Sequence, residues 1–358
     1  MGKKKLISFM LAMVLLMATL SGCTVDGEGK DTSSNPDTGV SSDNGDAKKE
    51  SDKKIKVGFA NINEKGSFGK MVRDSVEKEA EKRGYELICV DNNSDGATAV
   101  KNADDLLNMG IEYFIEFNVD DTVAPVIMEK MNAANVPVVA VDIAHPGAYF
   151  FGADNSEAGK IAGRAAAQYI KEKWNGEIDY VVRGIQPISG PVTAPRVMDF
   201  TVGMEEEGLI IPADKIIEID TQNDAQISQQ RMNDFLMAHP DAKRIAVVAM
   251  NDVLGAGIWA AVETAGRQDN VILYSHNSTA DFVEPLYATK GMTGWIGSVG
   301  YFPERYGEWI LPIIDELVEG KTPPEKSYID HELVTWENIT EHYPEDNFPW
   351  SKFMIDKK

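Results

Sequence analysis

The chain has 358 residues, of which 43% are apolar, and this is enough sequence to bury one large hydrophobic core or two medium-sized ones. Its 57 Asp and Glu residues outnumber its 35 Lys and Arg residues, for a net charge of −22. That excess argues against a nucleic-acid-binding protein, because phosphates would be repelled, and against a protein that lies flat on an anionic bilayer.

The N-terminus has the pattern of a secretory signal peptide. Three lysines precede an apolar run at residues 6–20, and two small residues lead directly to Cys23. The run is too short for a membrane-spanning helix. Small residues before a cysteine resemble the bacterial lipobox, in which the cysteine receives a diacylglycerol; the alternative is an ordinary signal peptide with a chance cysteine. We expect a signal peptide at residues 1–22, lipidation of Cys23, and a mature chain anchored by lipid to the outer face of the cell membrane.

A polar stretch follows this cysteine. Residues 24–52 are mainly Gly, Ser, Asp, Asn and Lys, with too few apolar side chains to offset the entropy lost on folding. We expect residues 23–52 to form a disordered linker that tethers a folded body to the membrane. The other cysteine, Cys89, lies in the apolar run 87–90 and has no disulfide partner left, which indicates a buried strand residue rather than a reactive thiol.

From residue 55 onward, short β-rich runs alternate with amphipathic stretches. The runs predict strands at residues 55–60, 86–90, 113–117, 137–141, 180–182, 215–219, 244–250, 271–274 and 293–297. Apolar spacing predicts helices at residues 71–83, 100–109, 158–173, 227–238 and 255–265. Alternating strands and helices are typical of α/β folds with parallel sheets covered on both faces, and so many strands favour two sheets.

Polar residues follow nearly every predicted strand. In open parallel sheets, ligands bind beyond the C-terminal ends of the strands. Amides and carboxylates there suit a neutral, hydroxyl-rich ligand; the alternative is that each residue caps the next helix or forms a turn. Capping needs no arginine or histidine, so the set as a whole favours a ligand cleft. The residues are Asn61, Asp91, Asn118, Asp142, Arg183, Asp220, Asn251, Ser275, His276 and Asn277.

From about residue 54 to residue 338, the chain resembles a type I periplasmic binding protein of the ribose and galactose group. The stretches that carry the resemblance are residues 79–85, 135–142, 153–159, 238–241 and 249–252. The resemblance implies two lobes, each a parallel sheet flanked by helices, joined by a three-segment hinge that lets them close on a ligand. It places the N-terminal lobe at residues 53–153 and 300–328, and the C-terminal lobe at residues 154–299 and 329–358.

The resemblance also implies roles in the pocket. Asp142 would accept hydrogen bonds from sugar hydroxyls, and Arg196 would donate to the ring oxygen and a hydroxyl. Asn251 would bind a hydroxyl, and Phe68 would pack on the apolar face of the sugar. The full set of expected ligand-binding residues is Asn61, Phe68, Asn118, Asp142, Arg196, Asn223, Asn251, Asn277, Ser298 and Tyr301.

Several positions depart from the ribose-binding pattern, so the pocket is re-cut and ribose itself is not implied. The residues that differ are Gly69, Ile143, Asn223 and Asn277, where those relatives have Phe, Arg, an aromatic residue and Asp, respectively. The segment 297–303 is also longer than usual. Its Tyr301 or Phe302, or the nearby Trp295, would supply the missing stacking surface. For His276 and the segment 298–301, a contact with the ligand and a purely structural role both stay open.

The sequence shows no catalytic constellation. Gly255 and Gly257 fall inside a predicted helix rather than in a phosphate-binding turn, and the five histidines lack metal-ligand spacing. We therefore expect no enzyme activity, no cofactor and no metal. The leading interpretation is a monomeric receptor that delivers a sugar-like ligand to the permease of an ABC importer. A receptor that presents its loaded form to a sensor kinase or chemoreceptor is the alternative, and a secreted glycosidase, which needs two cleft carboxylates, is the third.

Overall fold

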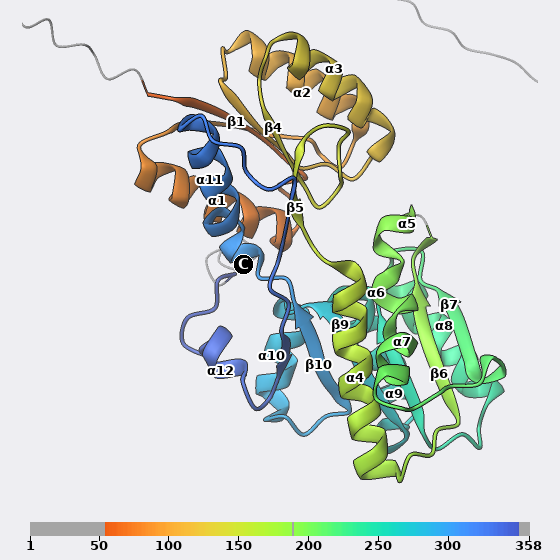
Figure 1. Cartoon of the computed structure of the whole chain (residues 1–358). Coiled ribbons are helices and arrows are strands. Elements are labelled where there is room, and N and C mark those ends of the chain that lie inside the picture. The colour runs from red at the N-terminus through yellow and green to blue at the C-terminus, as the bar shows by residue number, and fades with distance from the viewer. Residues whose placement is uncertain (1–53, 188–189, 351–358) are drawn as a thin grey trace, which may run out of the picture. The chain divides into compact units, whose positions relative to one another are not determined.

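The computed structural model describes residues 54–187 and 190–350, so the expected signal peptide, the lipidated Cys23 and the linker lie outside the described residues. In this part, strands and helices alternate along the chain and form two six-stranded sheets (Figure 1). The strands are β1 (Lys56–Asn61), β2 (Glu86–Asp91), β3 (Tyr113–Glu116), β4 (Val138–Val141), β5 (Tyr149–Gly152), β6 (Tyr180–Ile185), β7 (Ile216–Asp220), β8 (Ile245–Ala249), β9 (Val271–Asn277), β10 (Trp295–Gly300), β11 (Lys326–Tyr328) and β12 (Leu333–Thr335).

The helices fill the connections between these strands. The α-helices are α1 (Ser67–Arg83), α2 (Gly96–Asn108), α3 (Ala124–Ala133), α4 (Asn155–Trp174), α5 (Gly190–Thr193), α6 (Pro195–Met198), α7 (Phe200–Glu206), α8 (Ala225–Ala238), α9 (Asp252–Thr264), α10 (Ala280–Thr289), α11 (Tyr306–Val318) and α12 (Ile339–His342). The 3₁₀ helices are η1 (Asp121–Val123), η3 (Ala213–Lys215), η4 (Gln268–Asn270) and η5 (Pro303–Arg305). All nine predicted strands are present, and the three that the sequence missed, β5, β11 and β12, have only three or four residues each.

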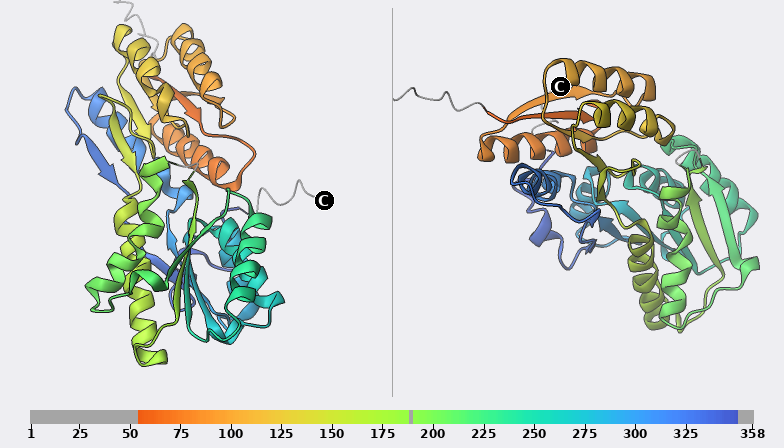
Figure 2. Two further views of the ribbon diagram at one scale, coloured as in Figure 1. Left: turned by 90° about the vertical axis from the view of Figure 1, so that its right-hand side faces the viewer. Right: turned by 45° about the horizontal axis from the view of Figure 1, so that its top comes forward.

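The first sheet has the strand order β11-β5-β4-β3-β1-β2 and is parallel throughout. Helices α1 and α11 lie on one face and α2 and α3 on the other (Figure 2). Successive strand residues point to opposite faces, so Phe59 packs in one core while its neighbour Ala60 packs with Phe114 in the other. Because both faces are buried, these strands read as apolar runs in the sequence.

The second sheet has the order β12-β10-β9-β8-β6-β7, and its strands are parallel except for β12, which runs antiparallel to β10. Helices α8 and α9 pack against each other, as do α4 and α7. Glycines allow both approaches. A Cβ at Gly257 would lie 2.1 Å from the Ala225 carbonyl oxygen, and one at Gly163 would lie 1.9 Å from that of Phe200. Gly257 thus lies inside α9, as the sequence predicted, and allows the close approach of α8.

The chain passes between the two sheets three times. It leaves the first sheet after β5, returns after β10 through η5 to α11, and leaves again between β11 and β12. These three connections agree with the expected three-segment hinge. The residue limits of the two lobes, 53–153 with 300–328 and 154–299 with 329–358, stay a proposal.

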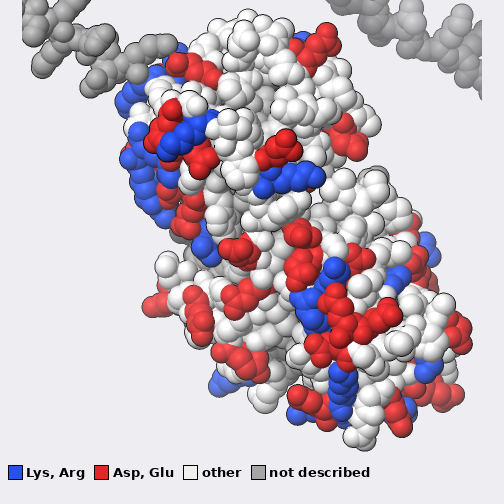
Figure 3. Space-filling view, viewed as in Figure 1, with Lys and Arg blue, Asp and Glu red and all other residues white. Residues whose placement is uncertain are grey.

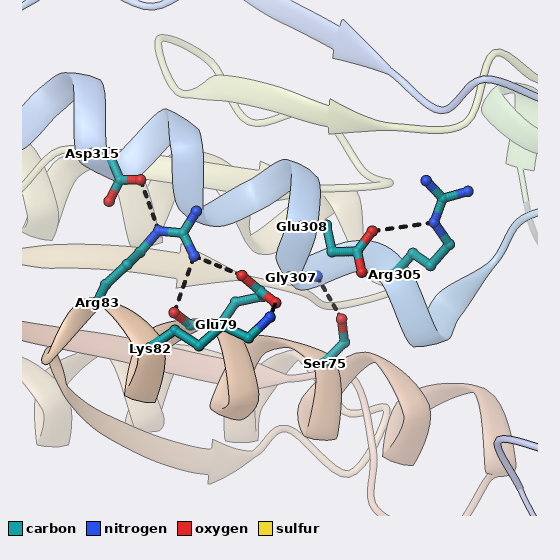
Figure 4. A network of polar contacts seen from close by, with 8 residues as sticks. All are labelled: Ser75, Glu79, Lys82, Arg83, Arg305, Gly307, Glu308 and Asp315. Atoms are coloured by element: carbon teal, nitrogen blue, oxygen red, sulfur yellow. Dashed lines mark hydrogen bonds and ion pairs between the residues drawn. The ribbon is translucent and has the colours of Figure 1, made fainter.

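The return of the chain after β10 is fixed by contacts between α1 and α11 (Figure 4). Arg83 Nε donates to Asp315 Oδ2 at 2.7 Å, and the Gly307 amide donates to Ser75 Oγ at 2.9 Å. A Cβ at Gly307 would lie only 2.3 Å from the Ser75 carbonyl oxygen. These contacts hold the first turn of α11, and with it Tyr306, against the first sheet.

Arg183 and Cys89 both lie inside strands. The sequence indicated that Arg183 follows the end of a strand, but β6 continues to Ile185. The guanidinium of Arg183 donates to the Met198 carbonyl oxygen. Cys89 lies in β2 and is partly buried, and burial raises the pKa of its thiol to about 12, so the thiol stays protonated at neutral pH.

Among the described residues, no helix combines the length and the apolar character needed to cross a membrane.

Candidate functional site

Asp142 occupies a tight turn at the C-terminal end of β4. Its backbone has a φ of +60°, and the Ile143 amide donates to the Val141 carbonyl oxygen at 2.7 Å across it. The carboxylate accepts from the Ala153 amide at 3.2 Å and from the Tyr306 hydroxyl at 3.2 Å. A Cβ on Gly152 would lie 2.7 Å from Asp142 Oδ1, so only glycine allows this approach. Two donors therefore engage the Asp142 carboxylate, whose two oxygens can together accept about four hydrogen bonds.

The side chain of Arg196, in the short helix α6 (Pro195–Met198), is held through its Nε atom and through one face of its guanidinium. Its Nε donates to Asn155 Oδ1 at 2.6 Å, and its guanidinium lies 4.4 Å above the ring of Tyr301. The Tyr301 hydroxyl donates to the same Asn155 oxygen at 3.2 Å. Among the described residues, neither Nη atom of Arg196 has a hydrogen-bond partner, so a fork of donors is left for a ligand.

Asp142 and Arg196 interact electrostatically. Burial raises the pKa of the Asp142 carboxyl, and the positive charge of Arg196 opposes this shift. The same two charges act on Tyr301 and Tyr306, whose hydroxyl pKa values burial raises. A carboxylate, a guanidinium and two tyrosines therefore form one cluster, although they come from three separate parts of the chain.

Aromatic rings flank this cluster on the side of the first sheet. Phe68, near the start of α1, contacts Tyr306 edge to face with ring centroids 5.7 Å apart. Phe151 packs against the same tyrosine at 5.2 Å. Phe68 is only partly buried, so its ring can still meet the apolar face of a ligand.

Two asparagines end neighbouring strands of the second sheet. Asn251 follows β8, where its Oδ1 caps α9 by accepting from the Leu254 amide at 3.0 Å. Asn277 is the last residue of β9 and has a φ of +102°. Among the described residues, the Asn251 Nδ2 and the Asn277 side chain have no hydrogen-bond partner. Asn251 therefore caps a helix and still offers an amide donor.

Four expected ligand residues have other surroundings. Asn61 is buried, and its Nδ2 donates to Asn63 and Glu64 in the β1–α1 loop and to Gly69 in the first turn of α1, while its Oδ1 is left without a partner among the described residues. Asn118 and Ser298 are buried and use their side chains in internal hydrogen bonds. Asn223 is exposed in the turn after β7, with a φ of +57°.

His276, Trp295 and Phe302 pack inside the protein. His276 is fully buried, its Nδ1 lies 2.9 Å from the Ala249 carbonyl oxygen, and burial lowers its pKa to about 3. Trp295 donates from Nε1 to Ser275 Oγ at 2.9 Å, and Phe302 stacks on His342. Tyr301 is buried too, but of the three aromatic candidates it is the one whose ring packs against the Arg196 guanidinium. His239 is the C-cap residue of α8.

Sequence reasoning missed Asn155 and Tyr306. Asn155 begins α4 inside a stretch that carries the family resemblance, and Tyr306 begins α11 directly after the hinge segment. A polar or aromatic residue at a helix start next to a hinge crossing is the signal that could have found both. Among the described residues, no group of histidine, cysteine and carboxylate side chains is arranged to hold a metal ion.

A family model described as periplasmic binding protein domain matches residues 57–322. The chain belongs to this family. It is 26% identical to the ribose import binding protein RbsB of Escherichia coli strain K12 over 272 residues, which cover 74% of this chain and 84% of that protein. It is also similar to the ribose import binding protein RbsB of Bacillus subtilis strain 168, at 25% identity over 281 residues, which cover 75% of this chain and 83% of that protein.

A solved structure agrees on the fold of this periplasmic binding protein. An ABC transporter solute binding protein from Mycobacterium smegmatis with bound glycerol matches with a TM-score of 0.67 and 23% identity, over 80% of this chain and 96% of that one. The expected α/β fold with two mostly parallel sheets is therefore confirmed. The chain is a member of a solute-binding family and not an enzyme.

Proposed function

We propose that this periplasmic binding protein is a lipid-anchored receptor outside the cytoplasmic membrane that captures a neutral monosaccharide or a close relative and delivers it to an ABC importer. One observation carries the ligand class: among the described residues, the two Nη groups of Arg196 have no hydrogen-bond partner, and they lie beside the carboxylate of Asp142, which accepts from two donors. Vicinal hydroxyls both donate and accept, so they can satisfy the carboxylate and the guanidinium at once.

The surroundings of this pair favour a neutral ligand. The strand ends add the amides of Asn251 and Asn277, and the net charge of −22 repels anions at long range. Acidic and basic side chains are interspersed over the face in Figure 3, apart from a strip of basic side chains along the left edge of its upper part. The curated relatives bind and import ribose according to their names, which supports a sugar and an importer as partner.

The residues proposed to contact the ligand fall into two groups. The first group consists of Phe68 on α1, Arg196 on α6, and Asp142, Asn251 and Asn277 at strand ends, and Tyr301 packs against the guanidinium of Arg196. For the other expected residues, a contact requires their internal hydrogen bonds to rearrange or, for Asn223, a ligand that reaches an exposed turn. These others are Asn61, Asn118, Asn223 and Ser298.

A thermal-shift screen of pentoses, hexoses, polyols and nucleosides tests the ligand class. A ligand at 100 times its Kd should stabilise the protein by about 2.7 kcal/mol. Arg196→Ala and Asp142→Ala should each weaken binding of the sugar found by about 30- to 1000-fold, because each leaves buried polar groups unpaired. Arg244→Ala is the control. Arg244 directly precedes β8 and pairs with Glu177, at the end of the strand that lies away from Asn251 and the proposed site. Binding of a free amino acid or a sugar phosphate, with no response to any sugar or polyol, would refute the proposal.

The anchor is tested separately because Cys23 lies outside the described residues. We expect Cys23→Ala to release the protein from the membrane fraction or to leave the signal peptide uncleaved. A mature-size Cys23→Ala protein that still fractionates with membranes would contradict lipidation.

A further inference from the structure

We propose that Glu116 is a positioning residue of the ligand site, which acts through Asn118 and His145 on the turn that holds Asp142. The role of Asp142 in ligand binding rests on the proposed function, whereas the chain of hydrogen bonds that leads to its turn does not. Glu116 is the last residue of β3 and is fully buried in a strand that is otherwise apolar or aromatic.

Among the described residues, hydrogen bonds reach Glu116 at one of its two oxygens. Asn118 Nδ2 donates to Oε1 at 2.7 Å and Asn92 Nδ2 donates to the same atom at 3.3 Å. The other oxygen, Oε2, is buried and has no partner among the described residues. Burial raises the pKa of this carboxyl to about 8, so at neutral pH it is mainly protonated. Oε1 then serves as a fixed carbonyl-like acceptor.

This acceptor sets the orientation of the Asn118 amide. The Asp120 backbone amide donates to Asn118 Oδ1 at 2.8 Å, and Glu116 accepts from Nδ2, so a flipped amide would lose both bonds. In this orientation Asn118 Nδ2 lies 3.4 Å from His145 Nε2 and can donate to it. Asn118 thus passes the constraint from the strand to the loop after β4.

The Asn118 donor in turn selects the tautomer of His145. The Ile143 carbonyl oxygen lies 3.0 Å from His145 Nδ1 and can only accept, so the proton belongs on Nδ1. Nε2 is then the acceptor that meets Asn118. Burial lowers the pKa of His145, which keeps the ring neutral. Both ring nitrogens are used, and each neighbour requires the same tautomer.

The chain of hydrogen bonds ends at the turn of Asp142. His145 holds the carbonyl of Ile143, whose amide closes that turn on Val141 at 2.7 Å. Asp142 has a positive φ that a non-glycine residue adopts only when its surroundings enforce it. Loosening Ile143 should therefore let the turn relax and misplace the Asp142 carboxylate.

The first test observes the tautomer of His145 without any ligand. The purified chain is labelled with ¹⁵N at its five histidines, and the signal lost in His145→Gln identifies His145 in long-range ¹H–¹⁵N spectra. We expect the Nδ1–H tautomer in the wild type and in Glu116→Gln, which keeps an acceptor oxygen. Glu116→Leu and Asn118→Ala should raise the share of the Nε2–H tautomer, because only the Ile143 carbonyl oxygen then favours the Nδ1–H form. An unchanged tautomer in both variants would overturn the proposal.

The second test measures amide hydrogen exchange over residues 141–148. Exchange in folded Glu116→Leu should be about tenfold faster than in the wild type and should return to the wild-type rate in Glu116→Gln. Glu79→Leu is the matched control, because Glu79 is also buried but pairs with Lys82 and Arg83 on α1 (Figure 4). Equal acceleration by Glu79→Leu would show a general loss of stability and refute a specific chain.

The third test uses the sugar that gives the largest thermal shift. Its Kd should rise about tenfold in Glu116→Leu and stay unchanged in Glu116→Gln. An unchanged Kd in Glu116→Leu, with an altered His145 tautomer, would show that the chain exists but does not position Asp142. If no sugar binds the wild type, the proposed function fails, and the two ligand-free tests still decide whether Glu116 controls the turn.

Discussion

Glu116 in the first sheet and Asp252 beside the second are both fully buried carboxyl groups, but their hydrogen-bond donors differ in number and arrangement. Glu116 accepts two hydrogen bonds from side-chain amides, both at Oε1. Asp252 accepts four, two at each oxygen. Its donors are the hydroxyls of Ser275 and Ser298 at Oδ1, and the backbone amide and hydroxyl of Thr279 at Oδ2.

This difference separates a group that joins several elements from one that orients a single neighbour. Asp252 ties the start of α9 to β9, to β10 and to the residue before α10, so it holds the strand ends that carry Asn251 and Asn277. Glu116 has one oxygen that lacks a partner among the described residues, and it reaches one loop through Asn118. A buried carboxyl group with full satisfaction stabilises the fold, whereas one with half satisfaction is better explained by what it positions.

The largest effect is expected for Asp252→Ala. Removing the carboxyl group leaves four buried donors without an acceptor, so the free energy of unfolding should fall by about 3–5 kcal/mol. Urea unfolding measures this loss. Asp224→Ala is the control, because Asp224 is an exposed cap of α8, and its loss should be about 1 kcal/mol. Equal losses in the two variants would contradict the joining role of Asp252.

The pH dependence of stability should distinguish the two groups next. Burial raises the pKa of Asp252 to about 7 and that of Glu116 to about 8, above their ordinary values of 3.8 and 4.5. Between the ordinary and the raised value, the folded state binds a proton that the unfolded state has lost. Each group therefore lowers the free energy of unfolding as pH rises, by up to about 1.4 kcal/mol per pH unit.

Variants that mimic the protonated forms assign these windows. Asp252→Asn should remove the decline between about pH 4 and 7, and Glu116→Gln should remove the decline that extends to about pH 8. Unfolding curves from pH 4 to 9 measure both. A wild-type profile that rises through these windows, and is unchanged in both variants, would show that neither group is protonated in the folded state.

A smaller effect is expected for Glu116→Ala. The free energy of unfolding should fall by about 2–3 kcal/mol, because the substitution leaves two amide donors unpaired and opens a small cavity. Glu116→Leu fills the cavity and should lose only about 1 kcal/mol. Thermal unfolding under identical conditions compares them. A loss for Glu116→Leu as large as that for Asp252→Ala would remove the contrast between the two carboxyl groups.

The smallest effect is expected for Thr279→Val. The substitution keeps the side-chain volume and the backbone amide that donates to Asp252 at 2.6 Å, and removes only the hydroxyl donor at 3.1 Å. We expect a loss of about 1 kcal/mol by urea unfolding. A loss near that of Asp252→Ala would mean that the hydroxyl, and not the set of four donors, supports the carboxyl group.

Much of the fold followed from local pattern. Apolar runs located nine strands, because strands buried on both faces need continuous apolar residues. The three missed strands are too short to show such a run, and β12 pairs with β10 only after the chain has crossed back from the first sheet. The same pattern placed Asp142 and Asn251 at strand ends, where the structure has them.

The site could be predicted only in part. Ser298 lies in β10, and the sequence did not show that its hydroxyl would donate to Asp252, which is 46 positions away. Tyr306 and Asn155 were missed because their partners are 164 and 41 positions away in the chain, respectively. Long-range hydrogen bonds of this kind leave no periodic signal in the sequence.

The sequence by itself determined the alternation of strands and helices, the acidic balance, and the residue types at the strand ends, because each depends on neighbouring residues or on composition. Only the tertiary structure decided which polar side chains are already paired. It paired Asn118 with Glu116 and His145, and left the Nη groups of Arg196 without a partner among the described residues. Pairing depends on distances between elements that pack together, and such distances are set by the fold as a whole.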